Sequence, residues 1–186
     1  MIVLDTNVLS ELMRQQPADA VLAWADRLKP QEVAITAMNE AEILQGIVRL
    51  PDSQRRQQLQ QGWDMLLSDV LQQPVLPFNS AAAQWFAALV SHREGLGRPI
   101  STADAVIAAT ALAHDGQLAT RNTGDFDAIG LKLINPWDLD GSKTWSKQRP
   151  LRPRHRRRLD GPSAQRHRLG AEHRKWMELP GRRPQP

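Results

Sequence analysis

Four acidic residues, Asp5, Glu42, Asp104 and Asp125, occupy positions from which one shared site could be assembled. Carboxylates that converge repel one another and raise each other's pKa unless cations neutralise them. A ligand set made only of oxygens favours a hard divalent ion, Mg²⁺ or Mn²⁺, over zinc. Such an ion can activate water and stabilise charge on a phosphate oxygen, so the quartet predicts hydrolysis of phosphodiester bonds.

Each of the four also has an ordinary structural explanation. Asp5 could cap the helix that follows it, and Glu42 could lie on a solvated helix face. Asp104 stands three residues after Ser101, which is the spacing of a capping box, and Asp125 could be a turn residue. A structural role is favoured for any one of them alone, so the chemical interpretation depends on whether they meet.

Hydrophobic spacing predicts the elements that would position these residues. The apolar run Met1-Ile-Val-Leu4 predicts a short buried strand that leads into Asp5. Further strands are predicted at residues 32–36, 75–78, 117–120 and 131–134. Helices are predicted at about residues 6–13, 18–28, 37–50, 53–72, 80–90 and 101–113, and the last is so apolar that it should be buried.

Short strands alternating with helices predict an α/β fold with a mostly parallel central sheet covered on both faces. The carboxyl ends of parallel strands meet at one edge, where open α/β sheets place their ligands. Asp5 ends the first strand, Glu42 lies in the helix after the second, and Asp125 follows the strand at 117–120. Asp104 joins them if its helix starts at the same edge.

Composition excludes several other classes of protein. The chain has no cysteine, which removes disulfides, thiolate zinc sites and cysteine nucleophiles. No His-Glu-x-x-His motif, glycine-rich phosphate loop or Ser-His-Asp order supports a rival mechanism. No signal peptide is predicted because Asp5 interrupts the apolar start, and the longest uncharged stretch contains Pro74 and Pro77. A cytoplasmic protein without a membrane segment is expected.

Charge divides the chain near residue 140. Residues 1–140 hold 10 Lys and Arg against 17 Asp and Glu, a net charge of −7, whereas residues 141–186 hold 14 against 3, a net charge of +11. We expect a globular domain over residues 1–139 and a basic, Pro- and Arg-rich tail over residues 140–186. Residues 141–186 lack Val, Ile and Phe, so the tail is expected to be disordered. It could add affinity for nucleic acid, although an extension without function is favoured.

Taken in order, several segments resemble those of PIN-domain ribonucleases, specifically the VapC-type toxins of bacterial toxin–antitoxin pairs. The matching segments are Val3-Leu-Asp-Thr-Asn7, Asn39-Glu-Ala-Glu-Ile-Leu-Gln-Gly46, Thr102-Ala-Asp-Ala-Val-Ile-Ala-Ala109, Thr120-Arg-Asn-Thr-Gly-Asp-Phe126 and Ile134-Asn-Pro-Trp137. The resemblance covers about residues 1–139 and implies a three-layer PIN-like fold. It also implies a Mg²⁺- or Mn²⁺-dependent endoribonuclease that cuts RNA, is neutralised by a cognate antitoxin and forms a homodimer. The tail departs from the pattern, since such toxins usually end near Trp137.

The resemblance implies roles for six residues. Asp5 and Asp104 would ligate the metal directly. Glu42 and Asp125 would complete the catalytic quartet, either by holding a second ion or by positioning the attacking water. Thr6 and Asn122 would orient these carboxylates through hydrogen bonds.

Other interpretations stay open beside the nuclease. A non-catalytic PIN-like module could bind an antitoxin or nucleic acid, but the complete acidic quartet argues against it. A phosphatase of the haloacid-dehalogenase type would need a second Asp where the chain has Asn7. Arg98, Arg121 and Lys132 could contact a phosphate backbone, although solvated surface is favoured for each. The helices at 18–28 and 53–72 are expected to offer apolar surface to a partner as well as to the core.

Overall fold

A computed structural model describes residues 1–70 and 75–138 of the chain. All of these residues belong to one compact unit. The predicted tail, residues 140–186, and the end of the helix predicted at 53–72 lie outside the described residues.

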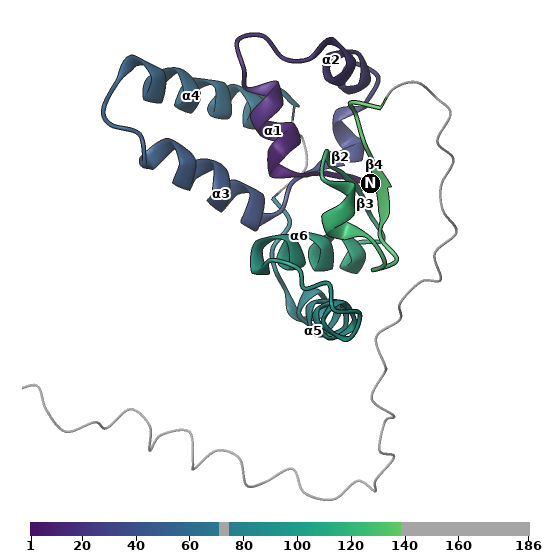
Figure 1. The fold of residues 1–186 in the computed structure, drawn as a ribbon. Helices are drawn as coiled ribbons and strands as arrows, with labels where there is room; N and C mark the ends of the chain where they lie inside the picture. The colour runs from purple at the N-terminus through teal and green to yellow at the C-terminus, as the bar shows by residue number, and fades with distance from the viewer. Residues whose placement is uncertain (71–74, 139–186) are drawn as a thin grey trace, which may run out of the picture. The chain divides into compact units, whose positions relative to one another are not determined.

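A four-stranded parallel sheet with strand order β2-β1-β3-β4 forms the centre of this unit (Figure 1). Val3 of β1 lies opposite Ala34 of β2 and Leu118 of β3. The predicted parallel sheet is therefore confirmed, with four of the five predicted strands close to their predicted limits. These strands are β1 (Ile2–Leu4), β2 (Val33–Ala34), β3 (Gln117–Ala119) and β4 (Lys132–Ile134).

The strand predicted at residues 75–78 is reduced to one bridge, which lies at a sheet edge as Pro77 indicates. Leu76 forms a single bridge to Thr36 at the edge of the sheet beside β2. Its N–H donates to the Ile35 carbonyl at 2.8 Å, and its carbonyl accepts from the Ala37 N–H at 2.9 Å. The pairing ends there because the partner segment leaves the sheet and enters a helix at Ala37.

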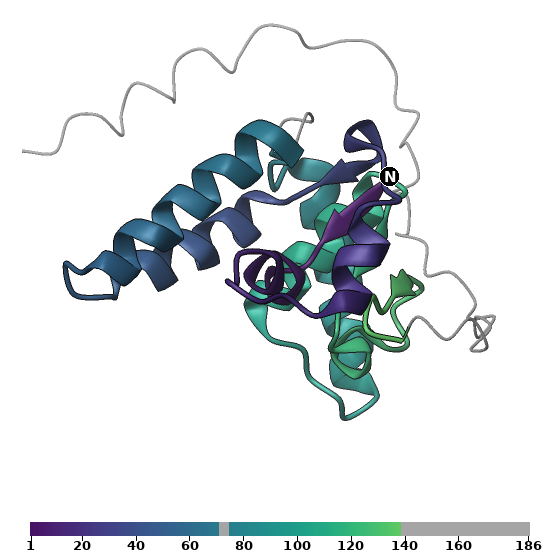
Figure 2. The same cartoon turned by 90° about the horizontal axis from the view of Figure 1, so that it is seen from above.

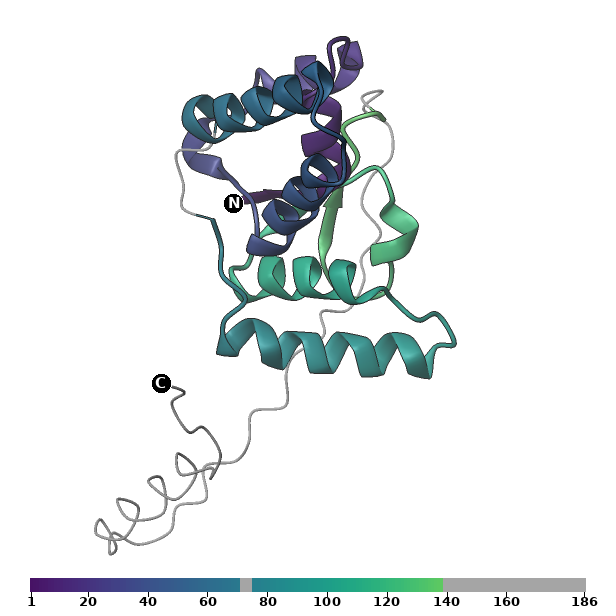
Figure 3. The same cartoon turned by 90° about the vertical axis from the view of Figure 1, so that its left-hand side faces the viewer.

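Side chains alternate along the strands between two cores. On one face Val3 and Leu118 pack with helices α5 and α6, and on the other face Leu4 and Ala119 pack with α1 to α4. Helices thus cover both faces of the sheet and give the predicted three layers (Figures 1 and 3). The helices are α1 (Thr6–Leu12), α2 (Asp19–Ala25), α3 (Ala37–Val48), α4 (Gln54–Met65), α5 (Ser80–Gly95) and α6 (Thr102–Ala113).

Local sequence sets where the helices begin. Thr36 and Asn39 form a capping box at the start of α3, and side chains of Ser53, Asn79 and Ser101 cap α4, α5 and α6. α3 and α4 form an antiparallel pair that extends away from the sheet (Figures 1 and 2). Single turns, η1 (Pro30–Glu32), η2 (Leu66–Val70, a π-helix) and η3 (Thr123–Phe126), complete the described elements.

α6 is the helix predicted to be buried, and this prediction is confirmed. Its residues Ala105, Ile107, Ala108, Ala109 and Ala111 are at most 1% exposed. The small alanine side chains allow α6 to lie between the sheet and α5 (Figure 3). Within the described ranges, no helix is both long and apolar enough to span a bilayer.

Candidate active site

The carboxyl ends of β1 and β3 form the centre of the candidate site. The chain leaves β1 toward β2 on one side, and β3 lies on the other side. In an open parallel sheet, ligands bind in the crevice at such a switch in strand order. Asp5 directly follows β1 and Thr120 directly follows β3, and the Thr120 hydroxyl donates to Asp5 Oδ2 at 2.6 Å.

Asp5 is only 5% exposed and accepts three hydrogen bonds. Its Oδ1 accepts from the Thr6 N–H at 2.7 Å, which makes Asp5 the N-cap of α1. Its Oδ2 accepts from Asn7 Nδ2 at 2.7 Å as well as from Thr120. The capping role considered from the sequence is therefore present, but it uses only one of the two carboxylate oxygens.

The pKa of Asp5 is raised above its ordinary value, chiefly because burial disfavours the charged form. Hydrogen bonds from the Thr120 hydroxyl and the Thr6 N–H oppose this rise, whereas the negative charges of Asp104 and Glu42 add to it. Two of the other predicted carboxylates are thus close enough for their charges to act on Asp5 at this edge. A bound cation would remove the repulsion that they share.

Glu42 reaches the site from α3 through Thr6. The Thr6 hydroxyl donates to Glu42 Oε2 at 2.5 Å and accepts from Asn39 Nδ2 at 3.0 Å. Asn39 is fully buried and fixed by its capping box with Thr36. The hydrogen-bonded series Asn39–Thr6–Glu42 therefore connects the start of α3 to the start of α1 and fixes the direction of the Glu42 carboxylate.

Asp104 lies in the first turn of α6 and is half-buried. Its Oδ2 accepts from the Ser101 hydroxyl at 2.6 Å, and its N–H donates to the same hydroxyl at 3.1 Å. Ser101 thus caps α6, but the predicted capping box is not completed, because the Asp104 carboxylate accepts from the Ser101 hydroxyl and not from its main-chain N–H. The other carboxylate oxygen, Oδ1, has no hydrogen bond to the described residues.

Asp125 is the least engaged of the four. It lies in η3 after β3 and is exposed, and its carboxylate has no hydrogen-bond partner within residues 1–70 and 75–138. Its charge is also absent from the causes of the Asp5 pKa shift. Asn122, predicted to orient a carboxylate, instead donates from its main-chain N–H to Thr120 Oγ1 at 3.0 Å. The structure thus groups Asp5, Glu42 and Asp104, with Asp125 at the margin.

The carboxylates at this edge do not form a complete cage of metal ligands. They suit a divalent ion such as Mg²⁺, which needs only a few ligands from the protein. Among the described residues, no three His, Asp or Glu side chains converge closely enough to form such a cage. Mg²⁺ does not require one, since it keeps several waters and binds through one or two carboxylates together with substrate phosphates. Asp5 and Asp104 are carboxylates of the required kind.

Sequence reasoning missed the roles of Thr120 and Asn39. Thr120 directly follows an apolar strand, as Asp5 does, and this shared position was the available signal. Asn39 occupies the third position of α3, where a capping box places a side chain that returns to the helix start. Neither residue signals from sequence alone that it will contact another element.

The family model described as PIN domain matches residues 2–132. The chain belongs to the PIN-domain family. Similar relatives include VapC ribonuclease Y4jK of Sinorhizobium fredii, 41% identical over 138 residues, which are 74% of this chain and 99% of the relative. Toxin FitB of Neisseria gonorrhoeae is 36% identical over 137 residues, again 74% of this chain and 99% of the relative. The resemblance to VapC-type toxins found in the sequence is confirmed.

Solved structures of similar proteins match the fold of this PIN domain. FitAcB from Neisseria gonorrhoeae matches with a TM-score of 0.67 and 36% identity, covering 75% of this chain and 100% of that chain. VapBC2 from Rickettsia felis, bound to a DNA fragment from its promoter, matches with a TM-score of 0.63 and 26% identity over 73% of this chain and 98% of that chain. The PIN domain accordingly corresponds to nearly the whole of these relatives.

Proposed function

We propose that the protein is an endoribonuclease that hydrolyses RNA phosphodiester bonds and is the toxin of a type II toxin–antitoxin pair. The observation that carries the proposal is the buried Asp5 carboxylate at the switch between β1 and β3. Its pKa is raised by burial and by the charges of Asp104 and Glu42. The VapC ribonuclease relative supports the same reaction, and the FitB relative supports the role of a toxin. We expect the enzyme to act in the cytoplasm.

Asp5 and Asp104 would hold Mg²⁺ or Mn²⁺, with Glu42 and Asp125 completing the catalytic quartet. When bound, the ion would lower the pKa of a bound water and stabilise charge on the phosphate oxygens. Asp5 is held ready for this role by donors on three residues, so little reorganisation is needed. Thr6 donates to Glu42 and restrains its carboxylate, which would orient the attacking water and accept its proton.

The neighbouring toxin–antitoxin complexes support a protein antitoxin as the partner of this chain. α2 and α4 were expected to offer apolar surface, but Trp24 and Trp63 are 8% and 1% exposed and belong to the core. Leu22 on α2 and Met65 at the end of α4 are the exposed apolar side chains there, at 37% and 62%. We propose these two residues, rather than the tryptophans, as candidates for antitoxin contact. The homodimer implied by the resemblance also remains a proposal.

A non-catalytic module that binds an antitoxin or nucleic acid is the second candidate. The observation in its favour is the lack of a complete ligand cage among residues 1–70 and 75–138. It predicts a protein that binds RNA and leaves it intact under every metal condition.

The two candidates are separated by an RNA cleavage assay on toxin purified free of antitoxin. We expect cleavage of total bacterial RNA in Mg²⁺, loss of cleavage in EDTA, and recovery when Mg²⁺ or Mn²⁺ is restored. Asp5→Asn and Asp104→Asn should each lower the rate by roughly 100- to 1000-fold, the usual effect of removing one electrostatic contact from an active site. Asp52→Asn, an exposed residue at the start of α4, is the matched control and should retain the wild-type rate. Full activity in both site variants would exclude the proposed mechanism.

A further inference from the structure

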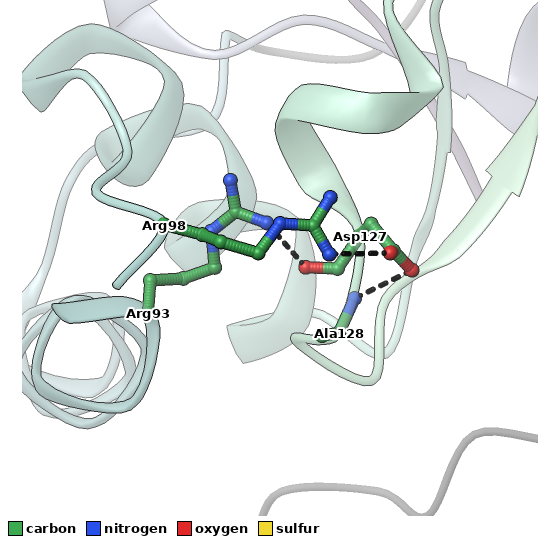
Figure 4. Close-up of polar contacts among 4 residues, drawn as sticks. All are labelled: Arg93, Arg98, Asp127 and Ala128. Carbon is green, nitrogen blue, oxygen red and sulfur yellow. Dashed lines mark hydrogen bonds and ion pairs between the residues drawn. The ribbon is translucent and has the colours of Figure 1, made fainter. Parts of the chain in front are cut away.

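Arg93, near the end of α5, is a buried cation without an anionic partner. It is 4% exposed, and within the described parts of the chain it forms no ion pair. Its Nη1 donates to the main-chain carbonyl of Asp127 at 2.9 Å (Figure 4). Its Nε is buried and has no hydrogen-bond partner among the described residues.

This arrangement is unfavourable for stability. A buried charge is tolerated when it is paired and fully hydrogen-bonded, and Arg93 meets neither condition. Replacing buried ionic groups by apolar residues of similar volume is often neutral or stabilising. The fold therefore gains little from a guanidinium here, and another requirement explains its presence.

The carbonyl that Arg93 holds lies two residues after Asp125. Asp125 is exposed, and its carboxylate has no hydrogen bond to the described residues, so contacts of the neighbouring main chain are what limit where the carboxylate can lie. Three residues before Asp125, the Asn122 N–H is tied to Thr120 Oγ1 at 3.0 Å. Arg93 provides the second tie on the other side of Asp125. The predicted catalytic residue is thus bracketed between a contact to the Asp5 network and a contact to α5.

Within the loop, the Asp125 N–H donates to the Asn122 carbonyl at 3.1 Å. The other side-chain contacts described for this loop are exposed or local. Arg98 pairs with the Asp127 carboxylate at 3.1 Å, but both side chains are substantially exposed, at 51% and 40%, and exposed ion pairs contribute little. Asp127 Oδ1 also accepts from the Ala128 N–H at 2.8 Å, and Ala128 has a left-handed φ of 63° (Figure 4). Phe126 is buried in the core, but apolar burial does not fix a direction. The hydrogen bond from Arg93 to the Asp127 carbonyl is the buried, directional contact that joins this loop to α5.

We propose that Arg93 is a positioning residue for the nuclease: it fixes the main chain at Asp127 and thereby places the Asp125 carboxylate at the sheet edge. This inference depends on the proposed function. It goes further by assigning a role to a residue on α5 that belongs to none of the matching sequence segments.

The test compares Arg93→Met, which keeps the length of the apolar stem, with wild type and with Arg55→Met. Arg55 is an exposed arginine on α4 and serves as the matched control. Using the full chain and total bacterial RNA in Mg²⁺, we expect Arg93→Met to lower kcat by roughly tenfold to a hundredfold, as small misplacements of reacting groups do. Its melting temperature should equal or exceed that of wild type. Amide hydrogen exchange over residues 122–130 should accelerate, while exchange in α6 stays unchanged.

A double-mutant cycle with Asp125→Asn separates positioning from a general structural role. If Arg93 acts through Asp125, adding Arg93→Met to Asp125→Asn lowers the rate no further, within about twofold, because coupled residues are not additive. A further loss equal to that of the single variant would overturn the inference. Wild-type kcat in Arg93→Met, or lost activity with unchanged exchange at 122–130, would overturn it while leaving the proposed function intact. A wild-type protein that never cuts RNA would contradict both the role of Arg93 and the proposed function.

Discussion

The Asp5 side chain combines a structural contact with conditions that disfavour its charge. One oxygen caps α1, and the other accepts from Asn7 and Thr120. Burial raises the pKa of Asp5 despite these hydrogen bonds, and Glu42 and Asp104 raise it further. A cap alone needs neither the burial nor the neighbouring acids, so the cost in stability indicates a functional site.

The destabilising effect of the ionised Asp5 carboxylate should be visible in how the free energy of unfolding depends on pH. Because the folded-state pKa lies above the ordinary value of 3.8 for an aspartate, ionised Asp5 destabilises the metal-free fold at neutral pH. This penalty is fully present above the folded pKa, declines as pH falls through it, and is absent below 3.8. Relative to Asp5→Asn, the wild type should therefore gain stability between pH 7 and pH 4. Urea unfolding of both proteins in EDTA measures the difference, and an unchanged difference across this range would contradict the prediction.

At the scale of elements, strands and helices could be predicted where their own residues decide the outcome. β1, β3 and α6 follow from apolar runs and caps, and therefore Asp5 and Asp104 could be placed at element ends. The contact between Asp5 and Thr120 could not be predicted, because it depends on β1 lying beside β3 in the sheet. Strand order is decided by packing across both faces, which no local pattern reports. The same reason explains why Asn39 and Arg93 were missed.

A second contact between elements joins α1 to α2 and involves Glu11. Glu11 is 7% exposed and accepts from the Ala18 N–H at the start of α2 at 2.8 Å. This hydrogen bond is the main reason that the pKa of Glu11 is lowered, with a further contribution from Arg14. The charged form of Glu11 therefore stabilises the native arrangement of the two helices.

Glu11→Gln should lower the free energy of unfolding by about 1 kcal/mol at pH 7, the difference between a charge-assisted and a neutral hydrogen bond. Because the folded-state pKa of Glu11 lies below the ordinary value of 4.5 for a glutamate, the advantage of wild type is complete above pH 4.5. It disappears as pH falls through the lower folded value. Chemical denaturation across this range measures the effect, and cleavage of RNA at pH 7 should be retained. A variant as stable as wild type at pH 7 would show that this contact is dispensable.

At the scale of the whole molecule, the PIN domain corresponds to nearly the full length of its relatives, while those matches cover 74% of this chain. We propose that residues 1–139 form the nuclease and that the basic residues 140–186 contribute nothing to the reaction. The acidic net charge of the first part and the basic charge of the second make this separation testable.

A chain ending at Asp138 should keep the melting temperature and kcat of the full chain. If the 14 basic residues beyond position 140 bind RNA, the full chain will show a lower KM at low salt, and this advantage will vanish as salt rises. If they have no role, KM will be equal at every salt concentration. A shortened chain that aggregates or loses kcat would show that the domain boundary is placed wrongly. RNA cleavage measured from low to high ionic strength, with thermal unfolding in parallel, distinguishes these outcomes.

The pairing of β1 with β3 also has a consequence for synthesis of the protein. Thr120, the partner of Asp5 in this hydrogen bond, is translated 115 residues after it. Parallel pairing across such a separation cannot form until the intervening chain is available. A nascent polypeptide therefore cannot assemble this edge of the sheet before the chain through β3 has been made, so the proposed nuclease site would form late in synthesis of the domain.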